Sequence, residues 1–191
     1  MGLLVEHLFN DAECREWFDF LSKKNIEYHK PYKRFGKMVK VPRGQASYTL
    51  NDQIHYNYGV SGGSPVNEVM CDKLKNITGL VNDKLGTNFN TILMNVYKNG
   101  EDCIGFHKDK ETGWVANTGF ATLAFGAERD FQIKSDAFGF FRIQTILHKN
   151  GSVIYMPYPL NHENTHAVPK RKKVNDCRIS LTFREIEESP K

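Results

Sequence analysis

The chain has 191 residues, the size of a single domain. Its 40% of hydrophobic residues, among them 13 Phe and 8 Tyr, are enough for a packed core and argue against a disordered chain. No apolar run approaches the roughly 20 residues that cross a bilayer, and no signal segment opens the chain. We therefore expect a protein of the nucleus or the cytoplasm, neither secreted nor bound to a membrane, and we expect a monomer.

The net charge of +4 is only a weak indication of a polyanionic partner. Its distribution says more, because basic residues gather in Lys30–Arg43 and in Lys170–Lys173, while acids gather at Glu185–Glu188. We expect the positive segments to follow a nucleic-acid backbone, although a solvated loop would also explain Lys170–Lys173. The four cysteines are far apart and form no Cys-x-x-Cys pair, which disfavours a zinc knuckle or a redox motif.

Two helical patterns precede residue 90. Asn10 or Asp11 can cap a first helix that runs toward Lys24 and is apolar on one face. A second helix is expected to start at Ser64-Pro65, with the serine as N-cap and the proline as its first residue, and to stop at Gly86. Its apolar residues recur every three or four positions, at Val66, Met70, Leu74, Ile77, Val81 and Leu85. This spacing predicts an amphipathic helix that lies outside a sheet.

The rest of the chain has the pattern of short strands. From Tyr28 to Tyr58 it is rich in aromatic and basic residues, with Gly and Pro as turn signals. After residue 90, turn signals such as Asn99-Gly100 and Asn150-Gly151 separate further strand-like segments. These segments are Ile92–Tyr97, Cys103–His107, Gly119–Phe125, Asp130–Lys134, Phe140–Leu147, Ser152–Pro157, Thr165–Val168 and Arg178–Arg184.

Successive short strands without intervening helices favour a closed or double-sheet β architecture. A jelly roll, whose mouth can hold a ligand, is the leading candidate. The fold class is therefore α+β but mainly β. We expect one domain over residues 1–191, with helices and short N-terminal strands in residues 1–90 and the jelly-roll core in residues 91–185.

A candidate metal site lies at a His-x-Asp segment. On an extended strand, side chains two residues apart lie on the same face, so His107 and Asp109 can meet one ion. Taken alone, a surface hydrogen-bonding pair would explain these two residues as well. His166 is the expected third ligand, with His162 as its rival. Two histidines and one carboxylate leave three positions open on an octahedron, which suits non-haem Fe(II) with a bidentate oxo-acid and O₂.

Two pairs of side chains could bind such an acid. Arg178 and Arg184 stand six residues apart on the last predicted strand, so both guanidinium groups face the same side and could bind a dicarboxylate. Asn95 and Tyr97 share a face of the strand that precedes the His-x-Asp segment. Taken alone, cross-strand packing would also explain Asn95 and Tyr97.

Four segments, taken in order, resemble the signature of the AlkB family: Asn95–Gly100, Ile104–Glu111, His166–Pro169 and Arg178–Arg184. Four motifs in the right order are more specific than any one of them. The resemblance covers the chain from about Phe35 to Glu185 and is nearest to the eukaryotic members that repair duplex and single-stranded substrates. It implies a double-stranded β-helix, which agrees with the strand pattern, with two supporting N-terminal helices and a β-rich nucleotide-recognition lid.

The resemblance also implies a dioxygenase that depends on Fe(II), 2-oxoglutarate and O₂. Carried over by position, the catalytic iron ligands are His107, Asp109 and His166. The implied contacts of 2-oxoglutarate are Asn95, Tyr97, Arg178, Ser180 and Arg184. Tyr97 and Arg178 would lie near the distal carboxylate. Asn95 and Arg184 would lie near the end that chelates iron. Ser180 departs from the family pattern, where an Asn is usual, so one hydrogen bond to the cosubstrate is expected to be weaker or mediated by water.

The segment from residue 35 to residue 46 is similar to the nucleotide-recognition lid of the family. Phe35 resembles the finger that wedges into the base stack beside a flipped nucleotide, and Arg43 is expected to contact substrate as well. Tyr56 and Tyr58 resemble a base-stacking pair. Glu111 resembles the acid that contacts the exocyclic nitrogen of a methylated adenine or cytosine and favours cationic lesions. On the residues alone, a turn aromatic at Phe35 and a loop acid at Glu111 remain open.

The implied reaction is the oxidative demethylation of N-alkylated bases, 1-methyladenine and 3-methylcytosine, in DNA and also in RNA. 2-Oxoglutarate would be converted to succinate and CO₂, and the methyl group would leave as formaldehyde. Two alternatives remain: a regulatory RNA demethylase of the same fold, and a nucleic-acid binding module in which the metal has no role. The complete set of metal ligands and the paired arginines argue against the binding module.

Overall fold

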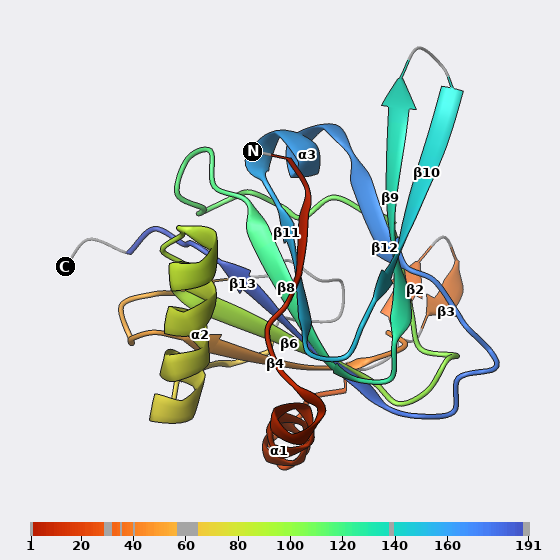
Figure 1. The fold of residues 1–191 in the computed structure, drawn as a ribbon. Coiled ribbons are helices and arrows are strands. Elements are labelled where there is room, and N and C mark those ends of the chain that lie inside the picture. Colours follow the sequence, from red (N-terminus) through yellow and green to blue (C-terminus); the bar gives the residue numbers. More distant parts are fainter. Residues whose placement is uncertain are drawn as a thin grey trace.

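The computed structural model describes residues 2–28, 32–34, 36–39, 41–56, 65–137 and 140–188. Two sheets make up its body (Figure 1). In spatial order, the larger sheet contains β1 (Leu4–His7), β11 (Ser152–Met156), β8 (Phe120–Gly126), β13 (Arg178–Arg184), β6 (Thr91–Tyr97), β4 (Gly44–Thr49) and β5 (Asn67–Val69). The smaller sheet contains β10 (Phe140–His148), β9 (Arg129–Ala137), β12 (Thr165–Val168) and β7 (Ile104–His107).

All the strands predicted after residue 90 are present as β6 to β13, with small shifts at their ends. The expected α+β fold, mainly β and of jelly-roll type, is confirmed. The larger sheet takes strands from both sides of residue 90, since β1, β4 and β5 come from the N-terminal part of the chain. The aromatic and basic segment after residue 28 also forms a separate hairpin of β2 (Tyr32–Arg34) and β3 (Lys37–Val39), as its turn signals predicted.

Successive side chains of a strand point to opposite faces of its sheet, so the two faces of the larger sheet can carry different kinds of residue. The odd-numbered residues of β13 are apolar and belong to a core cluster that includes residues of α1 (Asp11–Ser22) and α2 (Asp72–Leu85). The even-numbered residues of β13 are all polar and buried, and they are Arg178, Ser180, Thr182 and Arg184. Because they face away from the helices, these polar side chains line the interior between the two sheets.

The first predicted helix is confirmed as α1. Its N-cap is Asn10, whose side chain accepts hydrogen bonds from the backbone N–H groups of Ala12 and Glu13. The Glu13 carboxylate accepts from the backbone N–H of Asn10 in return, which completes a capping box. Four N–H groups at a helix start lack partners within the helix, so this pair of contacts fixes where α1 begins.

The predicted start of the second helix is wrong. Residues 67–69 form β5, which pairs in parallel with β4, and the N–H of Met70 donates to the carbonyl oxygen of Thr49 at 2.8 Å. Sheet pairing therefore outweighs the helical signal of Pro65, and α2 begins only after its N-cap, Cys71. Ser64 lies outside the described residues. The predicted stop is confirmed, because Gly86 adopts the left-handed conformation with φ 65°.

Two features of the structure were not predicted. The hairpin of β9 and β10 projects beyond the rest of the molecule (Figure 1). A short helix, α3 (Tyr158–Glu163), connects β11 to β12 and starts after Pro157, at a place where the sequence suggested only the end of a strand. Among the residues that the structure describes, no helix is both long enough and apolar enough to span a membrane.

Candidate active site

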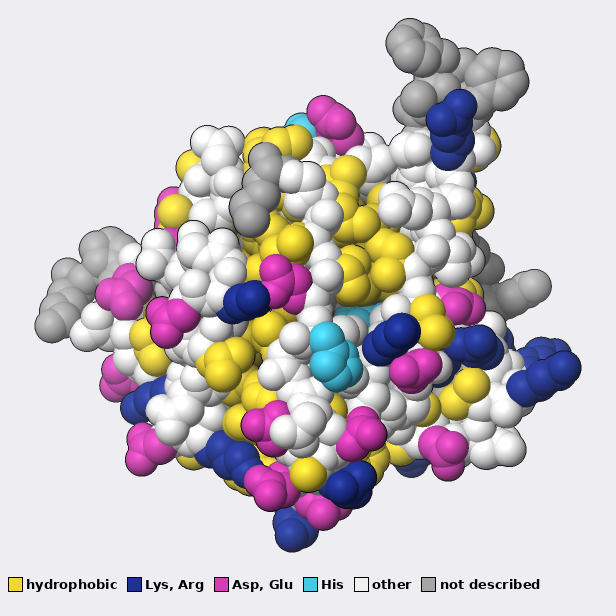
Figure 2. All heavy atoms as spheres, in the orientation of Figure 1, with side chains coloured by type: hydrophobic (Ala, Val, Ile, Leu, Met, Phe, Trp, Pro, Cys, Tyr) yellow, Lys and Arg dark blue, Asp and Glu magenta, His cyan; other side chains and the backbone are white. Residues whose placement is uncertain are grey.

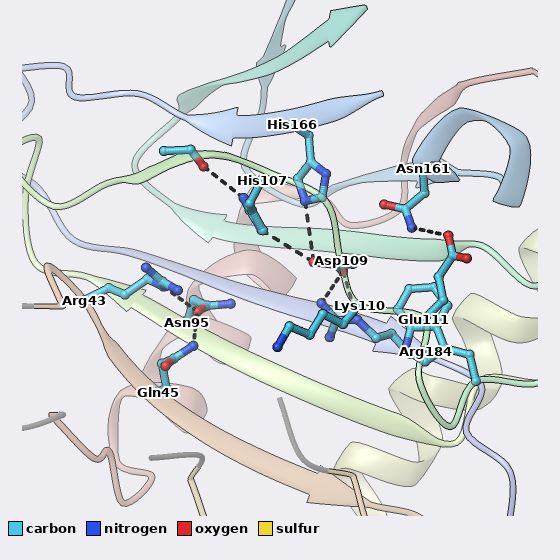
Figure 3. Close-up of polar contacts among 12 residues, drawn as sticks. Arg43, Gln45, Asn95, His107, Asp109, Lys110, Glu111, Asn161, His166 and Arg184 are labelled. Carbon is cyan, nitrogen blue, oxygen red and sulfur yellow. Dashed lines mark hydrogen bonds and ion pairs between the residues drawn. The ribbon is translucent and has the colours of Figure 1, made fainter. Parts of the chain in front are cut away.

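His107, Asp109 and His166 meet in the interior between the two sheets (Figure 3). His107 ends β7, Asp109 follows two residues later, and His166 lies on β12 directly opposite His107. Asp109 Oδ1 is 3.5 Å from Nε2 of His107 and 3.8 Å from Nε2 of His166. The ligand atoms that the three residues can offer all lie within 4.8 Å of one another. The structure thus assembles the three side chains that the sequence predicted as metal ligands.

The two oxygens of Asp109 have different partners. Oδ1 faces the two histidines, whereas Oδ2 accepts from Arg184, with distances of 3.0 Å to Nε and 2.5 Å to Nη2. Burial by itself raises the pKa of the Asp109 carboxyl, but the positive charge of Arg184, the largest of the opposing causes, helps to bring the net pKa well below its usual range. Oδ1 is therefore an anionic ligand atom at neutral pH, and Arg184 fixes its orientation.

Each histidine turns Nε2 toward this carboxylate. Nδ1 of His107 lies 2.9 Å from the carbonyl oxygen of Gly105, so Nδ1 carries the proton and Nε2 keeps the lone pair. The ring of His166 stacks on Phe131, with ring centroids 5.5 Å apart, and also packs against Phe120. Burial, only partly opposed by Asp109, lowers the pKa of His166 to about 3. Two imidazole nitrogens and one carboxylate oxygen are a donor set that fits Fe(II).

Arg178 is a buried cation, with 1% of its surface exposed. Its Nη2 donates to Nδ1 of His148 at 3.0 Å, and its charged centre lies 5.1 Å from the centre of the Tyr97 ring. Within the described residues, neither Nε nor Nη1 has a hydrogen-bond partner. Leaving charged donors unpaired in a protein interior is costly, so this position suits an anion. A carboxylate at the distal end of a dicarboxylic acid would meet that need.

A row of polar side chains crosses three strands of the larger sheet. Gln45 on β4, Asn95 on β6 and Ser180 on β13 lie side by side in register, and all are buried. Oδ1 of Asn95 accepts from Nε2 of Gln45 at 2.9 Å and from Nε of Arg43 at 3.0 Å (Figure 3). These two donors fix the orientation of the Asn95 side-chain amide, so its own N–H groups point away from Arg43 and Gln45. The structure thus places Arg43, predicted as a substrate contact, beside a predicted contact of the cosubstrate.

Glu111 lies against α3. Its Oε1 accepts from Nδ2 of Asn161 at 3.1 Å (Figure 3). Its Oε2 is 3.4 Å from Nδ1 of His162. Asn161 is completely buried, so this contact orients the carboxylate from a rigid position. His162, the rival third metal ligand, belongs to this group and not to the cluster of His107 and Asp109.

Tyr56 is mostly buried, with 6% of its surface exposed. Its hydroxyl group donates to the carbonyl oxygen of Lys110 at 3.0 Å and accepts from Nε1 of Trp114 at 2.8 Å. Tyr56 therefore holds the segment that follows Asp109, a role that the sequence did not suggest. The other predicted base-contacting aromatics, Phe35 and Tyr58, lie outside the described residues.

Three side chains of the site were missed in the sequence. Gln45 could have been found, since it is two residues from Arg43 on a predicted strand and so shares its face. His148 and Asn161 carried no comparable signal, because their partners are 30 and 50 residues away in sequence. Only the folded chain brings these pairs together.

Comparison with known proteins gives consistent results. The family model of the 2OG-Fe(II) oxygenase superfamily matches residues 2–184. The DNA oxidative demethylase ALKBH2 of Bos taurus is 34% identical over 189 residues, which cover 94% of this chain and 66% of that protein. ALKBH2 of Homo sapiens is also 34% identical over 189 residues, with 94% of this chain and 71% of that protein covered. This chain thus spans about two thirds of the length of these relatives.

More distant proteins are similar in sequence or in fold. The Homo sapiens alpha-ketoglutarate-dependent dioxygenase alkB homolog 3 is 26% identical over 125 residues, which cover 62% of this chain and 44% of that protein. The structure of OsALKBH1 superposes with a TM-score of 0.62 at 14% identity, over 96% of this chain and 98% of that one, and so supports the fold alone. The chain therefore belongs to the 2OG-Fe(II) oxygenase superfamily and, within it, to the AlkB family of dioxygenases that use Fe(II), 2-oxoglutarate and O₂.

Proposed function

We propose that this chain removes alkyl groups from N-alkylated bases of DNA by oxidising them. The observation that carries the proposal is the combination of two features in one interior: the cluster of His107, Asp109 and His166, and the buried Arg178 with N–H groups left for a carboxylate. The relatives named DNA oxidative demethylase make DNA the substrate to test first. Work on DNA would take place inside the cell, in the nucleus or the cytoplasm.

His107, Asp109 and His166 are the residues that would hold the iron. When bound, Fe(II), 2-oxoglutarate and O₂ supply the oxidation that hydroxylates an N-methyl group, and 2-oxoglutarate leaves as succinate and CO₂. The contribution of the protein is geometric and electrostatic. Asp109 offers one anionic oxygen because Arg184 binds the other, and the neutral ring of His166 is ready to bind a cation without first losing a proton.

The polar residues of β6 and β13 would hold 2-oxoglutarate. We assign its distal carboxylate to Arg178 and Tyr97, which are paired in register on β13 and β6 and lie against each other. The chelating end would lie near Asn95 and Arg184, since Arg184 already contacts the predicted metal ligand. Ser180 faces the same interior between these groups and is 3% exposed. The guanidinium of Arg178 provides positive charge for the distal carboxylate.

We propose 1-methyladenine and 3-methylcytosine as substrates because both bases are cations. Glu111 follows Asp109 by two residues, and Asn161 holds its carboxylate in place, so a negative group stands beside the reaction centre. After hydroxylation, the N-hydroxymethyl group would lose formaldehyde and restore the base without any nucleophilic side chain. Basic side chains of the loop between β12 and β13 gather at the edge of the molecule (Figure 2), where they could contact backbone phosphates.

The test is a panel of matched oligonucleotides, single- and double-stranded, of DNA and of RNA, each with one 1-methyladenine or 3-methylcytosine. We expect mass spectrometry to show loss of the methyl group from DNA, with formaldehyde and succinate as products. His107→Ala should abolish the reaction, whereas His7→Ala, at an exposed position on β1, should not.

Other results of this panel would change the assignment. Loss of methyl groups from RNA alone would establish the regulatory alternative instead. Consumption of 2-oxoglutarate without demethylation of any oligonucleotide would refute a nucleic-acid substrate. Binding of oligonucleotides by a protein that consumes no 2-oxoglutarate would favour the non-catalytic binding module.

A further inference from the structure

His148 is a completely buried histidine held between two partners. It ends β10, its Nε2 lies 2.9 Å from the carbonyl oxygen of Ser152, and its Nδ1 lies 3.0 Å from Nη2 of Arg178. We propose that His148 is a positioning residue for 2-oxoglutarate, which holds the guanidinium of Arg178 in the orientation that binds the distal carboxylate. The proposal rests on the function proposed above, because it takes Arg178 as a contact of the cosubstrate.

The two contacts fix the state of the ring. A carbonyl oxygen only accepts hydrogen bonds, so Nε2 of His148 carries a proton and donates it to Ser152. A guanidinium group only donates, so Nδ1 offers its lone pair to Arg178. The neutral ring satisfies both partners, whereas a doubly protonated ring would set a second cation against Arg178. His148 is therefore a fixed acceptor for one N–H of the arginine.

A neutral acceptor suits this task better than an acid. Arg184 is paired with the carboxylate of Asp109, so much of its charge is already balanced. No ion pair of Arg178 is found within the described residues, and its unbonded N–H groups are on Nε and Nη1. Because His148 orients the guanidinium without neutralising it, the positive charge of Arg178 remains available for the ligand.

The backbone that holds the ring of His148 is itself firmly bound to the larger sheet. The turn before Ser152 is bound to β8 twice: the N–H of Gly151 donates to the carbonyl oxygen of Ala124 at 2.7 Å, and the side-chain oxygen of Asn150 accepts from the N–H of Gly126 at 2.9 Å. β8 also pairs directly with β13, the strand that carries the guanidinium. His148 itself ends β10 of the smaller sheet, but Ser152 on β11, which holds its ring, and Arg178 on β13 both belong to strands that pair with β8 of the larger sheet. This common support limits how far the ring and the guanidinium can move apart.

The test compares two keto acids in protein loaded with Fe(II) under anaerobic conditions, with binding read from the absorption band of the chelate. 2-Oxobutanoate has the same chelating end as 2-oxoglutarate but lacks the distal carboxylate. We expect His148→Phe to raise the Kd of 2-oxoglutarate about tenfold and to change the Kd of 2-oxobutanoate less than about twofold. His148→Gln, whose amide keeps an acceptor and a donor, should recover part of the affinity. Ile146→Val, a change on the same strand, is the matched control and should bind both acids as the unchanged protein does.

Two results would overturn the proposal. Equal weakening of both keto acids would mean that His148 only maintains the fold of the site, and an unchanged Kd for 2-oxoglutarate would mean that Arg178 does not need it. If the unchanged protein fails to bind 2-oxoglutarate, the proposed function itself is refuted, and the role of His148 with it.

A measurement on the unchanged protein covers the case in which His148→Phe does not fold. Nitrogen-15 NMR of the histidine rings should show His148 neutral and protonated on Nε2, both before and after 2-oxoglutarate is added. A ring protonated on Nδ1 would contradict the proposal, because Nδ1 could then accept nothing from Arg178.

Discussion

Acid should destabilise this protein in part through His148. Burial, reinforced by the charge of Arg178, lowers the pKa of His148 to about 3, whereas a histidine in an unfolded chain has a pKa of about 6.5. Between these values the unfolded chain binds a proton that the folded protein does not. The stabilising contribution is therefore complete above about pH 6.5 and is lost as the pH falls toward 3. The linkage relation gives a loss of about 2 kcal/mol between pH 7 and pH 5 for one such histidine.

Urea unfolding at pH 7 and at pH 5, with a chelator present to keep metal off His166, measures this loss. His148→Phe removes the titrating ring, so the variant should lose about 2 kcal/mol less than the unchanged protein between the two pH values. Subtracting the two pH values within each protein cancels the direct cost of the substitution, and comparing the two proteins cancels the acid response of Asp109. Ile146→Val, which removes no titrating group, should keep the full loss. Equal losses in His148→Phe and in the unchanged protein would refute a buried neutral histidine at this position.

Three further substitutions test local features by their effect on the free energy of unfolding. Trp114→Phe removes the 2.8 Å hydrogen bond to the hydroxyl of Tyr56 and should cost about 1 kcal/mol in urea unfolding, and no loss would mean that this bond is absent in solution. Asn10→Ala removes the capping box of α1 and should also cost about 1 kcal/mol, and an unchanged melting temperature would contradict the assigned cap. Gly151→Ala should cost roughly 1–3 kcal/mol, because φ is +72° and the new Cβ would lie 2.5 Å from Sγ of Cys14. A Gly151→Ala protein as stable as the original would show that the turn can rearrange.

The strands of the core and the predicted metal ligands followed from sequence because their signals are local. Turn residues such as Asn150-Gly151 mark strand ends, and the period of two places Arg178 and Arg184 on one face before any pairing is known. His107 and Asp109 share a short segment for the same reason. His166 was a candidate third ligand from its place on a predicted strand, and the family resemblance favoured it over His162, since spacing says nothing about contacts between distant segments.

The features that could not be predicted depend on contacts between distant segments. The helical signal of Pro65 is real, but residues 67–69 gain hydrogen bonds to β4 that no local pattern reveals. The role of Tyr56 in holding the segment after Asp109 requires Trp114, which lies 58 residues further along the chain. A buried histidine such as His148 has the same appearance in a sequence whether it supports an arginine or only fills the core.

The central claim is that His107, Asp109 and His166 bind one Fe(II) ion together with 2-oxoglutarate. Its most direct test is the visible absorption band that appears when Fe(II) and 2-oxoglutarate are added to the protein without oxygen. The account predicts that the band forms with one iron per chain and disappears in His107→Ala. A spectrum that is the same in His107→Ala as in the unchanged protein would contradict it.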